Sequence, residues 1–139
     1  MNTVSDIMVS NVISVLDTDD VHKARMLFKD KGIRHLPVLN SEDDTFVGVL
    51  TQRSLLNHAF NIVEKFGMSG LEKRELRTQV REIMNTDCDI ATPDMDLVCA
   101  AEIFTSKKHS CLPVVENKQL VGIITSLDFV KLALYLLKS

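Results

Sequence analysis

The sequence is poor in aromatic side chains and carries no large excess of charge of either sign. Its 139 residues include no tryptophan and only 5% aromatic side chains, so isoleucine, leucine, valine and methionine must fill the core. Hydrophobic residues make up 45% of the chain, which argues against a disordered protein. The formal net charge of −3 lacks the basic excess that is typical of nucleic-acid-binding proteins. We therefore expect a folded chain that does not bind nucleic acid.

Long hydrophobic runs and regularly spaced cysteines are also missing. No stretch reaches the eighteen or so uninterrupted apolar residues of a membrane span, and the first residues lack the basic and apolar segments of a signal peptide. The three cysteines (Cys88, Cys99 and Cys111) are an odd number, and they show no metal-ligand spacing with the histidines. These absences predict a cytoplasmic protein without membrane segments, a disulfide framework or a metal site.

Motifs of common enzyme classes are absent as well. The chain has no Gly-x-x-x-x-Gly-Lys-Ser/Thr loop for nucleotide hydrolysis. It has no nucleophile elbow and no pair of carboxylates placed for acid–base catalysis. We expect no catalytic residues.

What the sequence does contain is an internal repeat. The letters VSDIM that begin at Val4 return as VREIM at Val80, an offset of 76 residues. At the same offset, the LPV that begins at Leu36 returns at Leu112. After a loss of two residues, the VG-x-x-T that ends at Thr51 returns as the VG-x-x-T that ends at Thr125. A repeat that keeps its apolar spacing, its proline and its glycine in order indicates a duplicated structural unit.

Each copy has the pattern β-α-β-β-α. In the first copy a short β segment at 12–15 precedes the acidic cluster Asp17–Asp20, which suits a helix N-cap and first turn. Apolar residues at helical spacing follow, and Gly32 stands where a helix ends. Two strands come next, around 36–39 and 46–50, and a second helix begins near Gln52. The pattern predicts an α/β (α+β) fold in which each copy has a mixed sheet with helices on it, and in which the two copies pair to cover their sheets.

We place the first copy at residues 1–66, a linker at 67–79 and the second copy at 80–139. The charged stretch Leu71–Arg77 predicts a mobile connector. The last helix, Phe129–Leu137, is apolar nearly all round except at Lys131. One face of this helix should pack on the core, and the remaining apolar surface predicts association into a homodimer.

The two copies, with IRHLPVL…FVGVLTQRSLL and HSCLPVV…LVGIITSLDFV, resemble a tandem pair of CBS domains, the regulatory modules named after cystathionine β-synthase. The resemblance extends from about Val4 to Leu137. It implies two motifs packed through their sheets about a pseudo-twofold axis, with a cleft for an adenosine nucleotide such as AMP, ADP or ATP. It also implies a non-enzymatic sensor that acts on a protein partner. The sequence leaves open whether S-adenosylmethionine is preferred, and it does not identify the partner.

The turn Thr125-x-x-Asp128 carries the proposed ligand chemistry. Its spacing is that of a helix capping box, which alone would explain both residues. The same helix N-terminus also offers backbone N–H groups to a phosphate, to which Thr125 and Ser126 can add hydroxyl donors. The resemblance implies that Asp128 accepts hydrogen bonds from the ribose hydroxyls. With the family context we favour the ligand role, and the two roles are compatible.

The resemblance further implies that the first copy holds the base of the same ligand. Ile13 and Ile33 would lie on either side of the adenine, and the basic pair Arg34 and His35 would meet phosphates. The residues assigned to this nucleotide-binding site are Asn11, Val12, Ile13, Ile33, Arg34, His35, Thr125, Ser126 and Asp128.

A second set of residues departs from the pattern, and it predicts a weak or empty site. Ser54 stands where the other copy has Asp128, and Asp89 adds an acid that would repel phosphate. The residues of this second site are Thr51, Arg53, Ser54, Ile90 and Cys111. The alternative to a sensor is a structural dimerisation module whose ligand sites are relics.

Overall fold

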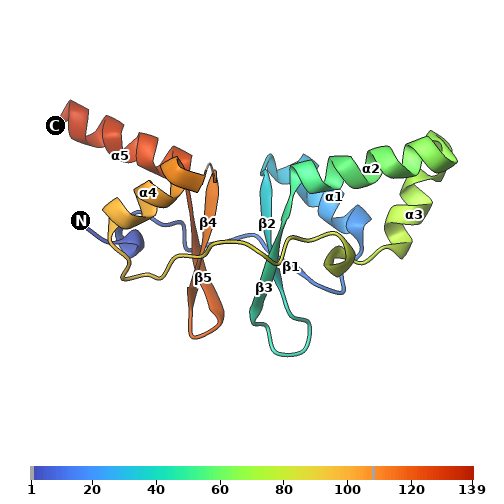
Figure 1. Cartoon of the computed structure of the whole chain (residues 1–139), viewed down its shortest axis with the longest axis horizontal. Helices are drawn as coiled ribbons and strands as arrows, with labels where there is room; N and C mark the ends of the chain where they lie inside the picture. The colour runs from blue at the N-terminus through green and yellow to red at the C-terminus, as the bar shows by residue number, and fades with distance from the viewer. Residues whose placement is uncertain (1, 108) are drawn as a thin grey trace. The chain divides into compact units, whose positions relative to one another are not determined.

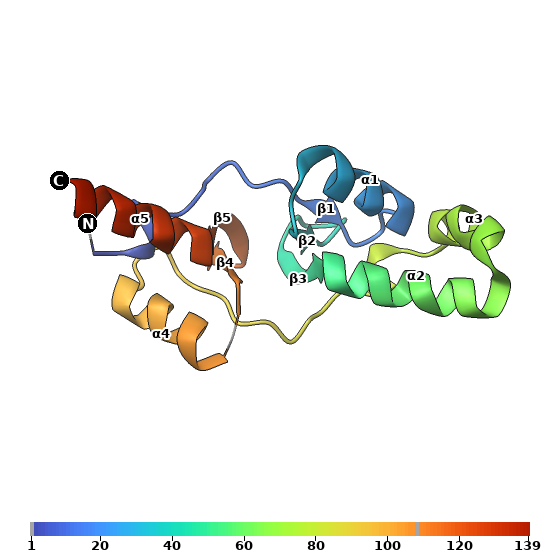
Figure 2. The ribbon, with the colours of Figure 1, turned by 90° about the horizontal axis from the view of Figure 1, so that it is seen from above.

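The computed structural model describes residues 2–107 and 109–139 and divides the chain into two compact units. Unit 1 contains the residues up to Val12 together with Asp89–Ser139, and unit 2 contains Ile13–Cys88. The predicted order of strands and helices is confirmed in both units, although the first strand of the second copy is reduced to a single bridge (Figure 1). Within each unit, the two longest helices lie on the same side of its strands (Figure 1, Figure 2).

The sheet of unit 2 has three strands in the order β1-β2-β3, with β1 parallel to β2 and β2 antiparallel to β3. The elements of unit 2 are β1 (Val15–Leu16), α1 (Val21–Lys31), β2 (His35–Leu39), β3 (Phe46–Thr51), α2 (Gln52–Phe66), the 3₁₀ helix η2 (Met68–Gly70), α3 (Leu71–Arg77) and the 3₁₀ helix η3 (Val80–Glu82). The expected β segment at 12–15 is therefore mostly not a strand. Only Val15 and Leu16 pair with β2, opposite Val38 and Leu39.

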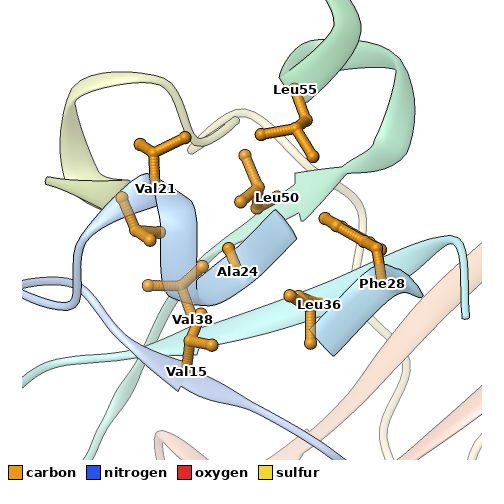
Figure 3. Packing of buried hydrophobic residues seen from close by; sticks show 9 residues of the cluster. Val15, Val21, Ala24, Phe28, Leu36, Val38, Leu50 and Leu55 are labelled. Carbon is orange, nitrogen blue, oxygen red and sulfur yellow. The ribbon is translucent and has the colours of Figure 1, made fainter. Parts of the chain in front are cut away.

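The core of unit 2 lies between this sheet and its helices (Figure 3). Aliphatic side chains from alternate strand positions meet the apolar face of α1, as the helical spacing predicts. Its buried residues are Val15, Val21, Ala24, Phe28, Leu36, Val38, Leu50, Leu55 and Val80. One member, Val80, belongs to the second copy of the repeat.

Unit 1 repeats this architecture around the antiparallel hairpin of β4 and β5. Its elements are the 3₁₀ helix η1 (Val4–Asp6), α4 (Leu97–Lys107), β4 (Cys111–Glu116), β5 (Gln119–Thr125) and α5 (Ser126–Lys138). Ala91 forms a parallel bridge to Val114 and so takes the place that β1 has in unit 2. The buried core residues are Val4, Ala91, Leu97, Ala100, Leu112, Val114 and Ile124.

The two copies exchange their leading segments, which the sequence pattern does not reveal. Val4 of the first copy is fully buried in the core of unit 1, and Val80 of the second copy is fully buried in the core of unit 2. Each leading segment then adds to the sheet, through the antiparallel bridges of Val9 to Ile123 and of Asn85 to Val49. The repeat boundaries in the sequence therefore differ from the boundaries of the compact units.

The ends of α1 follow the sequence signals closely. Asp20 is the N-cap, and its side chain accepts a 2.8 Å hydrogen bond from the backbone N–H of Lys23. Gly32 ends the helix at φ 62°, a left-handed conformation that glycine adopts without a steric penalty. The pattern had placed the other acids of the cluster in the first turn of the helix, but they precede it. Asp19, for example, accepts a hydrogen bond from the backbone N–H of Leu16.

The stretch Leu71–Arg77 is a packed helix, so the expectation of a mobile connector is wrong. Glu75 on α3 is only 1% exposed, and both of its oxygens accept hydrogen bonds from Arg25 on α1 at 2.6–3.0 Å. Arg74 stacks over the ring of Phe66, 3.2 Å from its centroid. These contacts hold α3 against α1 and against the end of α2 (Figure 2).

Among the residues that the structure describes, no helix has both the length and the apolar character needed to cross a membrane.

Candidate functional site

The turn from β5 into α5 holds Asp128 in a defined position. Thr125 is the N-cap residue, with extended backbone angles of φ −124° and ψ 166°. Asp128 Oδ2 accepts hydrogen bonds from the backbone N–H of Thr125 at 2.8 Å and from its hydroxyl at 3.2 Å. Both bonds end on the same oxygen, and within the described residues Oδ1 has no hydrogen-bond donor. Asp128 is only 9% exposed, so its position is fixed while one acceptor atom is unused.

The equivalent turn of the first copy forms without an acid. Thr51 is the N-cap of α2, and its hydroxyl oxygen accepts a 3.1 Å hydrogen bond from the backbone N–H of Ser54. The hydroxyl groups of the two residues also lie 3.0 Å apart. The chain therefore caps this turn with a serine in the position of Asp128, so the cap alone does not require a carboxylate there.

Gly122 lies against the leading segment of the first copy. A Cβ at this position would be 2.6 Å from Met8 Sδ and 3.0 Å from the carbonyl oxygen of Val9. The glycine therefore makes room for the exchanged leading segment, and the counterpart Gly48 does the same for Asn85.

The other predicted residues of the first site lie partly in unit 1 and partly in unit 2. In unit 1, Asn11 is exposed and Val12 is half-buried at the end of the leading segment. In unit 2, Ile33 is half-buried against the core, and Ile13 is 36% exposed. The structure therefore brings Thr125, Ser126 and Asp128 together in one turn, and it places the two isoleucines in the other unit.

The basic pair Arg34 and His35 leads into β2, beside the first copy's own turn. Arg34 is exposed, and its carbonyl oxygen accepts a 3.0 Å hydrogen bond from the backbone N–H of Gln52. His35 is opposite Thr51 in the β2–β3 ladder. Burial lowers the pKa of His35, and the charge of Arg34 lowers it further. At neutral pH, His35 is therefore a hydrogen-bonding group without a charge, whereas Arg34 carries a full positive charge.

The second set of residues is arranged in the same way within its units. Cys111 on β4 is opposite Thr125 on β5, and the backbone N–H of Ser126 donates to the carbonyl oxygen of Ser110 at 3.2 Å. Ile90 is 41% exposed just before the Ala91 bridge. In unit 2, Arg53 is exposed on the first turn of α2.

One polar pair in unit 1 was missed by the sequence reasoning. His109 Nε2 lies 2.8 Å from Asp89 Oδ2, and Lys107 Nζ lies 3.3 Å from Asp89 Oδ1. These hydrogen bonds, first that from His109 and then that from Lys107, lower the pKa of Asp89. We expected Asp89 to repel phosphate, and no local pattern pairs it with a residue twenty positions away. The signal that could have found the pair is the repeat offset, which aligns Asp89 and His109 with Ile13 and Ile33.

Two β-α-β-β-α units, each with a threonine-capped turn after its hairpin, define a tandem CBS-type module. The family model of the CBS domain matches residues 4–61 and 80–135. The chain therefore belongs to the CBS-domain family.

Relatives and solved structures agree with this assignment. MJ1404, an uncharacterized protein of Methanocaldococcus jannaschii, is 33% identical over 131 residues, which are 92% of this chain and 31% of MJ1404. The chain thus spans about a third of that relative. A structure of a putative acetoin utilization protein (AcuB) from Vibrio cholerae matches with a TM-score of 0.82 and 32% identity, over 99% of this chain and 94% of AcuB. The structure of CBSX2 in complex with AMP matches with a TM-score of 0.81 and 29% identity, over 98% of both chains.

Proposed function

We propose that this chain is a non-enzymatic regulatory module that binds an adenosine nucleotide, namely AMP, ADP or ATP. The observation that carries the proposal is the turn at Thr125, where Asp128 is held by two hydrogen bonds and keeps Oδ1 unused. Membership of the CBS-domain family and the likeness to CBSX2, which was solved with AMP, support a ligand of this class. The occupancy of this site would be passed on to a regulated protein partner. A cytoplasmic location remains a prediction.

The contact proposed for each side chain of the site follows from its chemistry. Asp128 Oδ1 accepts a hydrogen bond from a ribose hydroxyl, a contact in which the carboxylate charge strengthens the bond. Thr125 holds Asp128 in place through its backbone N–H and its hydroxyl group. The hydroxyl group of Ser126 and the positive end of the α5 dipole face the phosphate end. Apolar faces from Ile13 and Ile33 contact the base.

The remaining residues of the site lie at its polar end and at its margin. Arg34 pairs with phosphate by charge, and His35 donates a hydrogen bond. Asn11 and Val12 offer backbone groups to the edge of the base.

A test of the proposal is calorimetry with AMP, ADP and ATP on the wild type, on Asp128→Ala and on Ser54→Ala. The Asp128→Ala variant should lose roughly 1.5–3 kcal/mol of binding free energy, the range for hydrogen bonds to a charged group. That is a loss of about tenfold to a hundredfold in affinity. Ser54→Ala is the matched control, because Ser54 is at the same position of the other turn, and it should keep the wild-type affinity. Absence of binding by the wild type, or equal binding by wild type and Asp128→Ala, would remove the proposed function.

We further propose that two copies of the chain associate through α2 and α5. At the repeat offset of 74 residues that applies here, Leu56 and Phe60 on α2 correspond to Val130 and Leu134 on α5. All four side chains are exposed, by 45% to 68%. Exposed apolar side chains at equivalent positions of two helices are unfavourable in a monomer, and a twofold interface between two copies would bury them.

These stripes also support the alternative function, a structural dimerisation module with relic ligand sites. Such a module would show concentration-dependent melting without any stabilisation by nucleotide. A bound nucleotide would instead raise the melting temperature in proportion to the logarithm of its concentration. A thermal-shift series with AMP, ADP and ATP at two protein concentrations therefore separates the two functions.

A further inference from the structure

The pair Asp89 and His109 occupies a particular place in the repeat. At the offset of 76 residues, Asp89 is the counterpart of Ile13, and His109 is the counterpart of Ile33. In unit 2 these positions hold two aliphatic side chains, one 36% exposed and the other half-buried against the core. In unit 1 the same positions hold a carboxylate and an imidazole joined by a 2.8 Å hydrogen bond. One copy therefore offers two apolar surfaces where the other has a closed polar pair.

The Asp89–His109 pair is partly exposed, and a third residue also contacts its carboxylate. The side chains of Asp89 and His109 are 34% and 37% exposed, and Lys107 Nζ approaches the second carboxylate oxygen at 3.3 Å. The lowered pKa of Asp89 keeps it ionised at neutral pH, so the bonds to His109 and Lys107 are charge-assisted. The pair also joins Asp89, the first residue of the second segment of unit 1, to the residues that lead into β4.

We propose that the Asp89–His109 pair is the specificity-determining element that prevents the second set of residues from accepting an adenine base. The proposal rests on the proposed function, because it takes Ile13 and Ile33 as the residues that contact the base in the first site. A base inserted between Asp89 and His109 must break their hydrogen bond, and it gains no apolar contact in return. The ionised Asp89 would also repel the phosphate of the same ligand. The lack of an acid at Ser54 is therefore only one of two reasons for a weak second site.

The inference makes a prediction that differs from one based on Ser54 alone. If only the missing ribose acceptor weakens the second site, Ser54→Asp should create a second AMP site. If the polar pair closes it, Ser54→Asp must be combined with Asp89→Ile and His109→Ile. The control combines Ser54→Asp with Lys107→Ala, which removes the 3.3 Å contact to Asp89 and leaves the pair with His109 intact.

The experiment is calorimetry of the full chain with AMP, read as the number of AMP molecules bound per chain. We expect the triple variant to bind one AMP more than Ser54→Asp, while the Lys107 control binds the same number as Ser54→Asp. A second site in Ser54→Asp alone, or no gain in the triple variant, overturns the inference. The inference is judged by how many more AMP molecules the triple variant binds than Ser54→Asp. The proposed function is judged by whether the wild type binds AMP. A wild type that binds no AMP would therefore remove the Asp128 site without affecting this comparison.

A reverse exchange covers the case in which the triple variant does not fold. Ile13→Asp combined with Ile33→His places the polar pair in the first site and leaves the Asp128 turn unchanged. We expect AMP affinity to fall at least about tenfold relative to the wild type. Unchanged affinity in a folded Asp–His exchange variant would contradict the inference. A purely structural pair would change the melting temperature of the triple variant and add no AMP site.

Discussion

Replacing Gly48 by alanine should destabilise unit 2 markedly, because this glycine lies against the exchanged leading segment. A Cβ there would be 2.8 Å from the carbonyl oxygen of Asn85 and 3.1 Å from Met84 Sδ. Real Cβ atoms do not approach a backbone oxygen to 2.8 Å, so the segment must move. Movement weakens the two hydrogen bonds that join Asn85 and Val49, at 2.8 and 2.9 Å.

The size of the effect follows from these contacts. Overpacking of a tight interior costs about 1–3 kcal/mol, and each weakened backbone hydrogen bond costs up to about 1 kcal/mol. We therefore expect Gly48→Ala to lower the free energy of unfolding by about 2–4 kcal/mol. Gly122→Ala should cost less, about 1–2 kcal/mol. Its closest clash, at 2.6 Å, is with the flexible Met8 Sδ, and the Val9 oxygen is 3.0 Å away.

Urea denaturation of both variants measures these differences, and amide hydrogen exchange locates them. Gly70→Ala is the control, because the nearest atom to a Cβ there is Phe66 Cβ at 3.6 Å, which is an ordinary contact. The amides of Val49 and Asn85 should exchange faster in Gly48→Ala than in the control. A cost below about 0.5 kcal/mol for Gly48→Ala, or a larger cost for Gly122→Ala, would refute the close approach of the leading segment.

Three further substitutions test other contacts. Arg25→Ala removes the hydrogen bonds from Arg25 to the buried carboxylate of Glu75 and leaves it with His22 Nδ1 at 3.8 Å. Urea denaturation should show a loss of about 3 kcal/mol, at the low end for buried pairs because Arg25 is partly exposed. His109→Gln should raise the pKa of Asp89 towards its ordinary value of 3.8, measured by NMR titration. Because the folded pKa of Asp89 is the lower one, its contribution to stability is complete above that ordinary value and is lost as the pH falls below it. Leu134→Asp should shift the chain to monomers in sedimentation equilibrium, and an unchanged mass would argue against association through α5.

Much of the fold could be predicted because the sequence contains two copies of one repeat, which can be compared with each other. The repeated LPV, glycine and threonine place strands, hairpin and second helix in both copies, and the structure confirms that order. Local signals also succeed where the physics is local. The N-cap at Asp20 and the left-handed Gly32 depend only on neighbouring residues.

The larger misses involve partners that are distant in the sequence. Arg25 and Glu75 are 50 residues apart, so the charged composition of α3 indicated a solvated connector and concealed a buried ion pair. The exchange of leading segments pairs Val9 with Ile123, and it explains why position 122 has room only for a glycine. Periodicity reports which face of an element is buried, but it does not report which element covers that face.

The candidate site divides in the same way. The turn from Thr125 to Asp128 could be predicted to the residue, because an N-cap and the third helical position have fixed spacing. The hydrogen bond between Asp89 and His109 could not be predicted, since the sequence does not indicate where either side chain points. The repeat offset had already aligned both residues with isoleucines, and the structure adds the 2.8 Å contact that makes the difference meaningful.

The most direct test of the central claim is the affinity of Asp128→Asn for AMP, measured together with its melting temperature. Asparagine keeps an oxygen that accepts the backbone N–H of Thr125, so the turn and the fold should survive, but it removes the charge that strengthens a ribose contact. We predict that AMP affinity falls at least about tenfold while the melting temperature changes little. Wild-type affinity for AMP in this variant, or a lowered melting temperature without any loss of binding, would show that Asp128 serves the cap and not a ligand.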